Sequence, residues 1–292
     1  MKLKSECIPC LLGRVLYEAN LVTNDETLKM KALLGACKTL IESYDTILSS
    51  AEIATKVHKT AYKILGTKDP YKKLKEESNR LALQLLPKIK SIIENSEEHL
   101  KTSMLCAIIG NILDFGIRGS ESDPSVLIEK FDKYFSEGLK YDDSGKVKEL
   151  LKDAKNIVFV TDNCGEIVFD KLLCQEIKKF NNRLKITLVV RGEPILTDAT
   201  MEDVLKIGFD EVVDKILTTG TFAVGLNIKK IPADLKKVLK NSDLIICKGM
   251  ANYEAFSETN YKPIAYLLRT KCTAIANDMN LPLNINAIKL YY

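Results

Sequence analysis

The sequence of 292 residues has no tryptophan, two histidines and no long apolar run, and each shortage narrows the choice of protein class. No apolar segment approaches the roughly 20 residues that a membrane span needs, so a membrane protein is not expected. The first residues, MKLKSECIPCLLGR, lack a long apolar stretch with a small-residue cleavage site, which predicts a cytoplasmic location. Eight cysteines are too few for a disulfide scaffold of this length, so we expect mostly free thiols.

The charge distribution and the absence of certain motifs argue against further classes of protein. The 43 basic residues are spread among 39 acidic ones and the net charge is +4, so no basic stripe suited to a nucleic-acid polymer is expected. Neither a GxxxxGK[ST] loop nor a GxGxxG turn after a strand is present, which argues against P-loop and dinucleotide-binding proteins. His58 and His99 are too isolated to form a catalytic pair, and each is expected at a helix surface.

The chain divides into two parts with different hydrophobic patterns. Residues 1–150 read as successive helices with little strand signal. From about residue 155, apolar runs at 156–163, 184–192 and 243–249 alternate with amphipathic helices, as in buried parallel strands. Residues 210–220 and 270–278 are expected to form two further strands. The predicted fold class is α/β: a Rossmann-like, doubly wound, mostly parallel sheet in residues 151–292, with an all-helical domain of residues 1–150 packed over its active face.

Two of the expected strands end in residues that can bind a metal. Asp162 and Asn163 directly follow the first strand, and Asp198 follows the second after a short loop. Because doubly wound sheets bind ligands at the carboxyl ends of their strands, these side chains are expected to face one cavity. Their oxygens suit a divalent cation such as Mg²⁺ or Mn²⁺. The competing interpretation is that they only cap the following helices.

Four other polar residues and a pair of cysteines are further candidates for a functional site. Lys248 and Lys271, near strand ends, can neutralise phosphate oxygens, although solvated lysines are equally common there. Asn111 and Asp114 lie on one face of an apolar helix, where they either pair across helices or face a metal cleft. The CxxC of Cys7 and Cys10 lacks the further ligands of a zinc site, so inert packing, metal or redox pairing and a substrate-side role all stay open.

Several segments together resemble the damage-control phosphatase family, formerly a family of unknown function. The segments are TDNCGE, RGEPILTDAT, KGMANYEAF and LLRTKC, and the resemblance continues through CIPC, DPYKKLKEESN and GNILDFG in the helical half. It thus covers most of the chain in order. The amino-terminal CxxC is similar to that of the small prokaryotic subfamily I, which is associated with nucleotide phosphates, rather than to the larger eukaryotic sugar-phosphate members.

The resemblance implies roles for particular residues. Asp162, Asn163 and Asp198 would bind a divalent metal, Mn²⁺ or Ni²⁺ foremost, with Co²⁺ and Mg²⁺ as the other candidates. With Glu166 and Arg191 at the same strand ends, the expected substrate- and phosphate-binding set is Asn111, Asp114, Glu166, Arg191, Lys248, Asn252 and Lys271. Two departures from the family stand out: Lys271 lies one residue closer to Arg269 than in larger members, and position 250 is Met where some members have an acid.

The expected function is metal-dependent hydrolysis of phosphomonoesters of small metabolites, damaged nucleotides or related sugar phosphates, in metabolite damage control. The attacking group is water, which we favour, or Asp162 itself. One alternative is an S-adenosylmethionine-dependent methyltransferase, which needs a glycine-rich turn where only Gly165 stands and an acid where Arg191 stands. The other is a nucleotide-binding module without turnover. The partner is a small phosphate ester, and the oligomeric state is not predicted.

Overall fold

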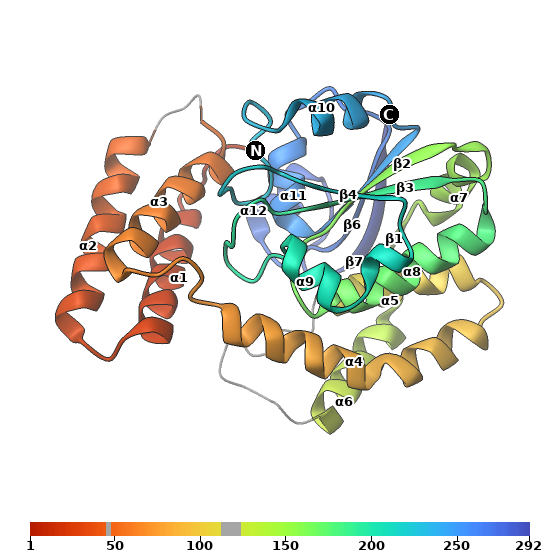
Figure 1. Cartoon of the computed structure of the whole chain (residues 1–292), viewed down its shortest axis with the longest axis horizontal. Helices are drawn as coiled ribbons and strands as arrows, with labels where there is room; N and C mark the ends of the chain where they lie inside the picture. The colour runs from red at the N-terminus through yellow and green to blue at the C-terminus, as the bar shows by residue number, and fades with distance from the viewer. Residues whose placement is uncertain (45–47, 112–123) are drawn as a thin grey trace.

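One seven-stranded sheet, covered by helices on both faces, organises the computed structural model, which describes residues 1–44, 48–111 and 124–292 (Figure 1). Strand β7 runs antiparallel to β6, and the other neighbouring strands pair in parallel. The expected mostly parallel, doubly wound α/β fold is therefore confirmed. Across the sheet the order is β1 (Tyr141–Asp142), β7 (Asn286–Tyr291), β6 (Ile264–Arg269), β5 (Leu244–Lys248), β2 (Asn156–Val160), β3 (Lys185–Val190) and β4 (Lys215–Thr218).

The central strands are mostly apolar because they contribute to two cores. On β2, Ile157 and Phe159 pack into one core, whereas Val158 and Val160 pack into the other. This alternation follows from the period of two along a strand. The helices that close the first core are α5 (His99–Gly110), α7 (Ser144–Asp153), α8 (Glu166–Phe180) and α9 (Met201–Lys206). Those that close the second are α10 (Ala233–Lys240), α11 (Gly249–Phe256) and α12 (Thr273–Asp278).

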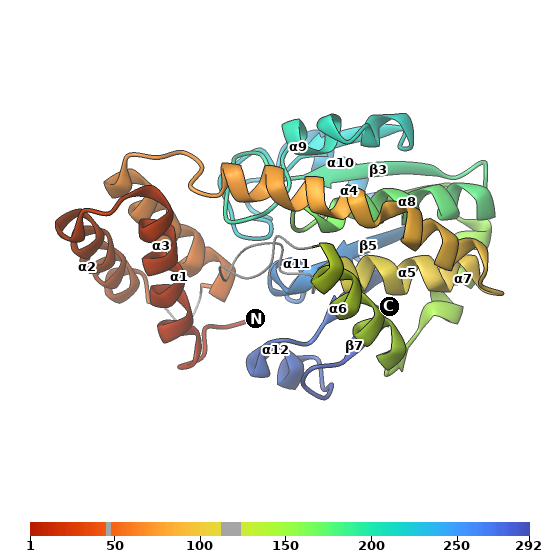
Figure 2. The ribbon, with the colours of Figure 1, turned by 90° about the horizontal axis from the view of Figure 1, so that it is seen from below.

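The remaining helices form an outer layer and a separate group. Helices α4 (Lys72–Glu94) and α6 (Pro124–Glu137) pack with α5 and α8 around Phe131 and Phe169. Helices α1 (Cys7–Val22), α2 (Glu26–Ser43) and α3 (Ser50–Leu65) have a core of their own. Figure 2 shows these three helices beside the sheet rather than over one of its faces. The division at residue 150 stays a prediction: α5, which precedes it, and α7, which spans it, share a core with the sheet.

The strand order fixes where a ligand would bind. From β2 the chain moves outward to β3 and β4, and then returns to β5 on the other side of β2. The carboxyl ends of β2 and β5 thus flank the point where the strand order reverses. Open α/β sheets bind ligands in the crevice at such a point.

Two expectations about strands need correction. Residues 270–278 do not form a strand: the strand is β6, directly before them, and Ala274 and Ile275 enter the second core from helix α12. A short apolar stretch does not distinguish a strand from one helical turn, and this ambiguity explains the error. In residues 210–220 the strand is limited to β4, after the 3-10 helix η1 (Phe209–Glu211). Along the described ranges, no helix has the length and apolarity needed to cross a membrane.

Candidate active site

The loops that follow β2 and β3 pair with each other through their backbones. Asn163 and Asp198 form an antiparallel bridge. The amide of Cys164 donates to the carbonyl of Thr197 at 2.8 Å, and the amide of Ala199 donates to the carbonyl of Asp162, also at 2.8 Å. The structure thereby brings Asp162, Asn163 and Asp198 together at the carboxyl edge of the sheet.

The side chains of these loops are in mutual contact and nearly buried. The amide nitrogen of Asn163 donates to Oδ2 of Asp162 at 2.9 Å, while its oxygen accepts from the hydroxyl of Thr197 at 2.6 Å. Arg191, which is 1% exposed, joins the two aspartates: its Nε donates to Oδ2 of Asp198, and its Nη2 lies 3.5 Å from Oδ1 of Asp162. Arg191 therefore fixes the positions of both carboxylates from the buried side of the site.

Asn111 and Lys271 extend the site towards solvent. The amide nitrogen of Asn111 donates to Oδ2 of Asp162 at 3.0 Å and also to Glu166. The exposed Lys271 donates to Oδ1 of Asn111 at 3.1 Å and to its carbonyl. The structure therefore gathers both residues around Asp162. Asp114 lies outside the described residues.

Lys248 and Asn252 occupy the interior behind the loops. Lys248 is fully buried and donates to Asp170 at 2.6 Å, to Glu166 at 3.2 Å and to the carbonyl of Ala107 at 2.9 Å. The amide nitrogen of Asn252, likewise fully buried, donates to the carbonyls of Thr161 and Lys248 at 2.9 and 2.7 Å. These contacts tie the ends of β2 and β5 to α8 and α11.

The buried charges of the site do not balance. Four carboxylates (Asp162, Glu166, Asp170 and Asp198) are paired with two cations, Arg191 and Lys248, so full ionisation leaves an excess of two negative charges. Burial raises the pKa of Glu166 to about 8; Lys248 opposes this shift and Asp162 adds to it. Burial also raises the pKa of Asp170 and of Asp198 to about 6, against the charges of Lys248 and Arg191 respectively. A bound divalent cation would supply the missing charge.

The available donors also fit such a cation. Two carboxylates and one carboxamide oxygen form the set of oxygen ligands that Mg²⁺ and Mn²⁺ accept. Among the residues that the structure describes, no three His, Cys, Asp or Glu side chains are arranged to hold a metal. A metal site at this edge would therefore need a different third ligand, for which the carboxamide oxygen of Asn163, beside Thr197, is the candidate.

Reasoning from the sequence missed three residues that position the site. Gly249 has φ of +71°, and a Cβ atom there would lie 1.9 Å from Oδ2 of Asp162. Thr197 orients the amide of Asn163, and Asn79 on α4 accepts from the amide of Gly165 at 2.6 Å. A glycine directly after a buried strand was a usable signal for Gly249. No local pattern links Asn79 to Gly165, because 86 residues separate them.

Other chemistry-bearing residues lie away from this edge. His58 is buried against Glu18, with Nδ1 2.8 Å from Oε1, so its expected surface position is wrong. His99 is exposed, as expected. All eight cysteines are free: Cys7 is partly buried, Cys10 is exposed, and the two form no disulfide.

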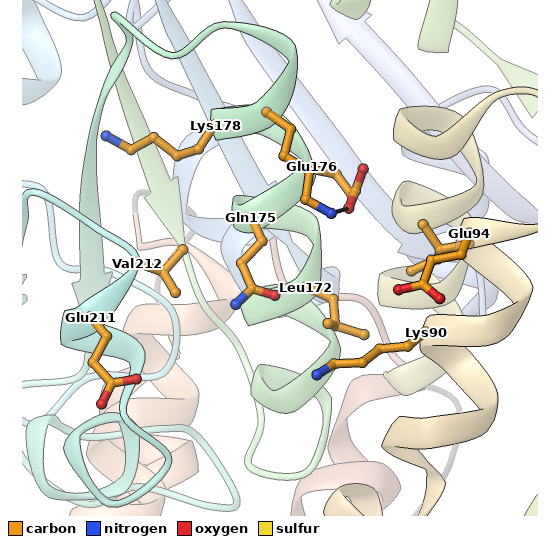
Figure 3. Close-up of a pocket in the computed structure, with 10 residues that line it drawn as sticks. Lys90, Glu94, Leu172, Gln175, Glu176, Lys178, Glu211 and Val212 are labelled. Carbon is orange, nitrogen blue, oxygen red and sulfur yellow. Dashed lines mark hydrogen bonds and ion pairs between the residues drawn. The ribbon is translucent and has the colours of Figure 1, made fainter.

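A cavity of about 490 Å³ opens between α4, α8 and η1, away from the paired loops (Figure 3). Figure 3 shows Lys90, Gln175 and Lys178 among the side chains around it. Gln175 follows Glu166 by nine residues, which is about 14 Å along the axis of α8. The cavity is therefore distinct from the edge where Asp162 and Asp198 meet.

Comparison with known proteins shows the family to which the chain belongs. Residues 3–284 match the model of the damage-control phosphatase ARMT1-like domain. A damage-control phosphatase of Archaeoglobus fulgidus is 42% identical over 96% of both chains, and one of Pyrococcus horikoshii is 32% identical over 97% of this chain and 96% of the relative. The crystal structure of a DUF89 family protein from Pyrococcus horikoshii superposes with a TM-score of 0.92 at 29% identity, covering 100% of both chains. From the nearly complete match and the extent of these similarities, we conclude that the chain belongs to the damage-control phosphatase family.

Proposed function

We propose that this protein is a divalent-metal-dependent phosphatase that hydrolyses phosphomonoesters of small metabolites, namely damaged nucleotides or related sugar phosphates, in metabolite damage control. Membership of the family supports the phosphatase chemistry. The excess of buried carboxylates where the loops after β2 and β3 meet is the single observation that supports metal dependence.

Asp162, Asn163 and Asp198 are the proposed metal ligands. Mn²⁺ or Ni²⁺ is the proposed ion, with Co²⁺ or Mg²⁺ as the alternatives. When bound there, such a cation would supply positive charge to stabilise the phosphate oxygens of the substrate. Thr197 and Arg191 fix the orientation of the ligands, because each is hydrogen-bonded to one of them.

Lys271 and Asn111 are the proposed phosphate-binding residues. Lys271 is exposed and contacts Asn111, which in turn contacts Asp162, so its ammonium group lies at the solvent side of the carboxylates. Lys248 is fully buried and already has three oxygen partners. We therefore assign Lys248 and Asn252 to holding the frame of the site, and Lys271 to charge neutralisation on the substrate.

Water is the proposed attacking group. Both carboxylate oxygens of Asp162 already have partners: Oδ2 accepts from Asn111 and Asn163, and Oδ1 faces Arg191. A carboxylate that in addition binds the proposed metal is a weaker nucleophile, whereas a water molecule can attack the phosphorus and lose its proton to a neighbouring carboxylate. A phospho-enzyme trapped at Asp162 would contradict this assignment.

The decisive experiment is phosphate release measured with and without metals. Protein stripped with EDTA is assayed with p-nitrophenyl phosphate and a panel of nucleotides and sugar phosphates, each with Mn²⁺, Ni²⁺, Co²⁺ or Mg²⁺. We expect release that needs added metal and that falls at least a hundredfold in Asp162→Ala and Asp198→Ala. Asp132→Ala is the matched control, because Asp132 is a half-exposed aspartate paired with Lys88 at the surface.

The same assay decides between the proposal and its rivals. Nucleotide binding without phosphate release under any metal would favour a binding module. Methyl transfer from S-adenosylmethionine would favour a methyltransferase. Equal phosphate release in EDTA and in Mn²⁺ would refute the metal dependence.

A further inference from the structure

The loop that carries Asp198 passes through a strained residue. Leu196 has φ of +49°, a left-handed conformation that is unfavourable for a residue with a Cβ atom. Thr197 and Asp198 follow directly, and these are the residues that contact Asn163 and Arg191. A strained conformation beside the site persists only where surrounding contacts enforce it.

A contact from the separate helical group meets this requirement. The hydroxyl oxygen of Tyr62, on α3, accepts a hydrogen bond from the amide of Leu196 at 3.1 Å. Tyr62 lies 134 residues away in sequence and is 4% exposed, so the bond is shielded from water. Burial, followed by the charge of Glu18, raises the pKa of Tyr62, which keeps its hydroxyl neutral.

The ring of Tyr62 is itself fixed by the neighbouring loop. It meets the ring of Phe222 edge to face, with centroids 5.4 Å apart. The amide of Phe222 donates to Glu193 at 3.1 Å, in the same loop as Leu196, and the amide of Val224 donates to Thr55 of α3 at 3.0 Å. Helix α3 thus contacts both the loop after β3 and the loop after β4.

We propose that Tyr62 is a positioning residue that holds the Leu196 backbone, and through it Thr197 and Asp198, in the arrangement that binds the metal. The inference rests on the proposed function for the statement that a metal ion binds at Asp198. The hydrogen bond between Tyr62 and Leu196 does not depend on that function. Through this contact, the helices α1–α3 would stabilise the loop after β3 from outside the sheet.

The test uses Tyr62→Phe, which removes the hydroxyl and keeps the ring against Phe222. Tyr71→Phe is the matched control, because Tyr71 is a second buried tyrosine near Glu18 whose hydroxyl interacts with Arg14 instead of the loop. In metal-free protein, hydrogen exchange at the Leu196 amide should accelerate at least tenfold in Tyr62→Phe and stay unchanged in Tyr71→Phe. Amides of β2 should exchange as in the wild type in both variants.

Metal binding and kinetics give a readout that a purely structural role would not move. Calorimetric titration with Mn²⁺ should show about tenfold weaker binding in Tyr62→Phe, as expected for loss of one hydrogen bond. The Mn²⁺ concentration for half-maximal rate should rise in parallel, with kcat at saturating Mn²⁺ within twofold of the wild type. Adding Leu196→Asn, which tolerates the left-handed conformation better, should recover part of the affinity.

The outcomes separate this inference from the proposed function. Unchanged exchange at Leu196 in Tyr62→Phe would overturn the positioning role. Unchanged Mn²⁺ affinity in this variant would do the same. Wild-type protein that binds no divalent cation would refute the proposed function, and the exchange measurement on metal-free protein would still decide the role of Tyr62.

Discussion

Gly249 and Asp162 occupy positions that leave no room for a side chain between them. The ideal Cβ position of residue 249 lies 1.9 Å from Oδ2 and 2.6 Å from Cγ of Asp162, and 3.1 Å from the amide nitrogen of Asn111. The first helical residue after β5 thus forms one wall of the site through its backbone alone. Any larger residue must push the carboxylate away.

Gly249→Ala should therefore abolish metal binding and reduce activity at least a hundredfold. The change combines a collision with Asp162 and the strain of φ at +71°. Gly66→Ala is a control for the strain alone, because Gly66 has φ of +69° and its Cβ position meets nothing within 4 Å. Mn²⁺ titration and phosphate release should separate the two variants, even if both lose about 1 kcal/mol of stability. Equal effects on Mn²⁺ binding would show that the collision is unimportant.

Two lysines of the site should respond differently to removal. Lys248→Met leaves Glu166 and Asp170 without their buried cation, and we expect a loss of about 3 to 5 kcal/mol in the free energy of unfolding. Lys271→Met removes an exposed charge, so stability should change by less than about 0.5 kcal/mol while KM for the phosphate ester rises. Urea unfolding in EDTA and steady-state kinetics measure the two effects. A Lys248→Met protein of normal stability with a raised KM would reverse our assignment.

The stability contributed by Asp203 should depend on pH. Burial acts to raise its pKa, but Lys75, 2.8 Å away, and hydrogen bonds from Thr200 outweigh burial and lower the pKa below the ordinary 3.8. A carboxyl whose pKa is lower in the folded state stabilises the fold above its unfolded pKa, and this contribution disappears as the pH falls through the folded pKa. Asp203→Asn should thus be less stable than the wild type by about 3 kcal/mol at pH 7.

The difference between the two proteins should shrink steadily below about pH 4. Urea unfolding of wild type and Asp203→Asn between pH 3 and pH 8 provides the measurement. A gap that is constant over this range would indicate that shape, rather than charge, determines the effect of the substitution.

Thiol reactivity should divide the cysteines into two groups. Cys7, Cys10, Cys37 and Cys272 are exposed or partly exposed, whereas Cys106, Cys164, Cys174 and Cys247 are buried. Burial raises the pKa of the Cys164, Cys174 and Cys247 thiols, which further slows their reaction. Ellman's reagent should titrate up to four thiols in native protein and all eight in urea. Rapid reaction of more than four thiols in native protein would show that the interior opens easily.

The sequence was sufficient to predict the central strands of the sheet and the meeting of the loops after β2 and β3. Continuous apolar runs such as residues 156–160 are typical of strands buried on both faces, and parallel pairing places their polar ends side by side. Strand β7 was missed, and so was its neighbour β1, an edge strand of two residues. Short strands carry few residues from which a pattern can be recognised.

The partners of buried charged groups could not be predicted. Lys248 ends a strand, as a phosphate-binding lysine would. Only the structure shows that it is paired with Glu166 and Asp170, which lie one turn apart on α8. The buried position of His58 could not be predicted for a similar reason. Its contact with Glu18 joins two helices that are distant in sequence. Such pairings depend on how helices pack against each other.

The backbone bonds between the loops after β2 and β3 have a consequence for isolating this protein. Because Cys164 pairs with Thr197 and Ala199 pairs with Asp162, backbone hydrogen bonds of the fold hold the proposed metal ligands close together. One divalent ion of the proposed site can then replace another without any refolding step. The metal content of a purified sample would record what the culture medium supplied, so the native ion has to be identified from material grown at controlled metal levels.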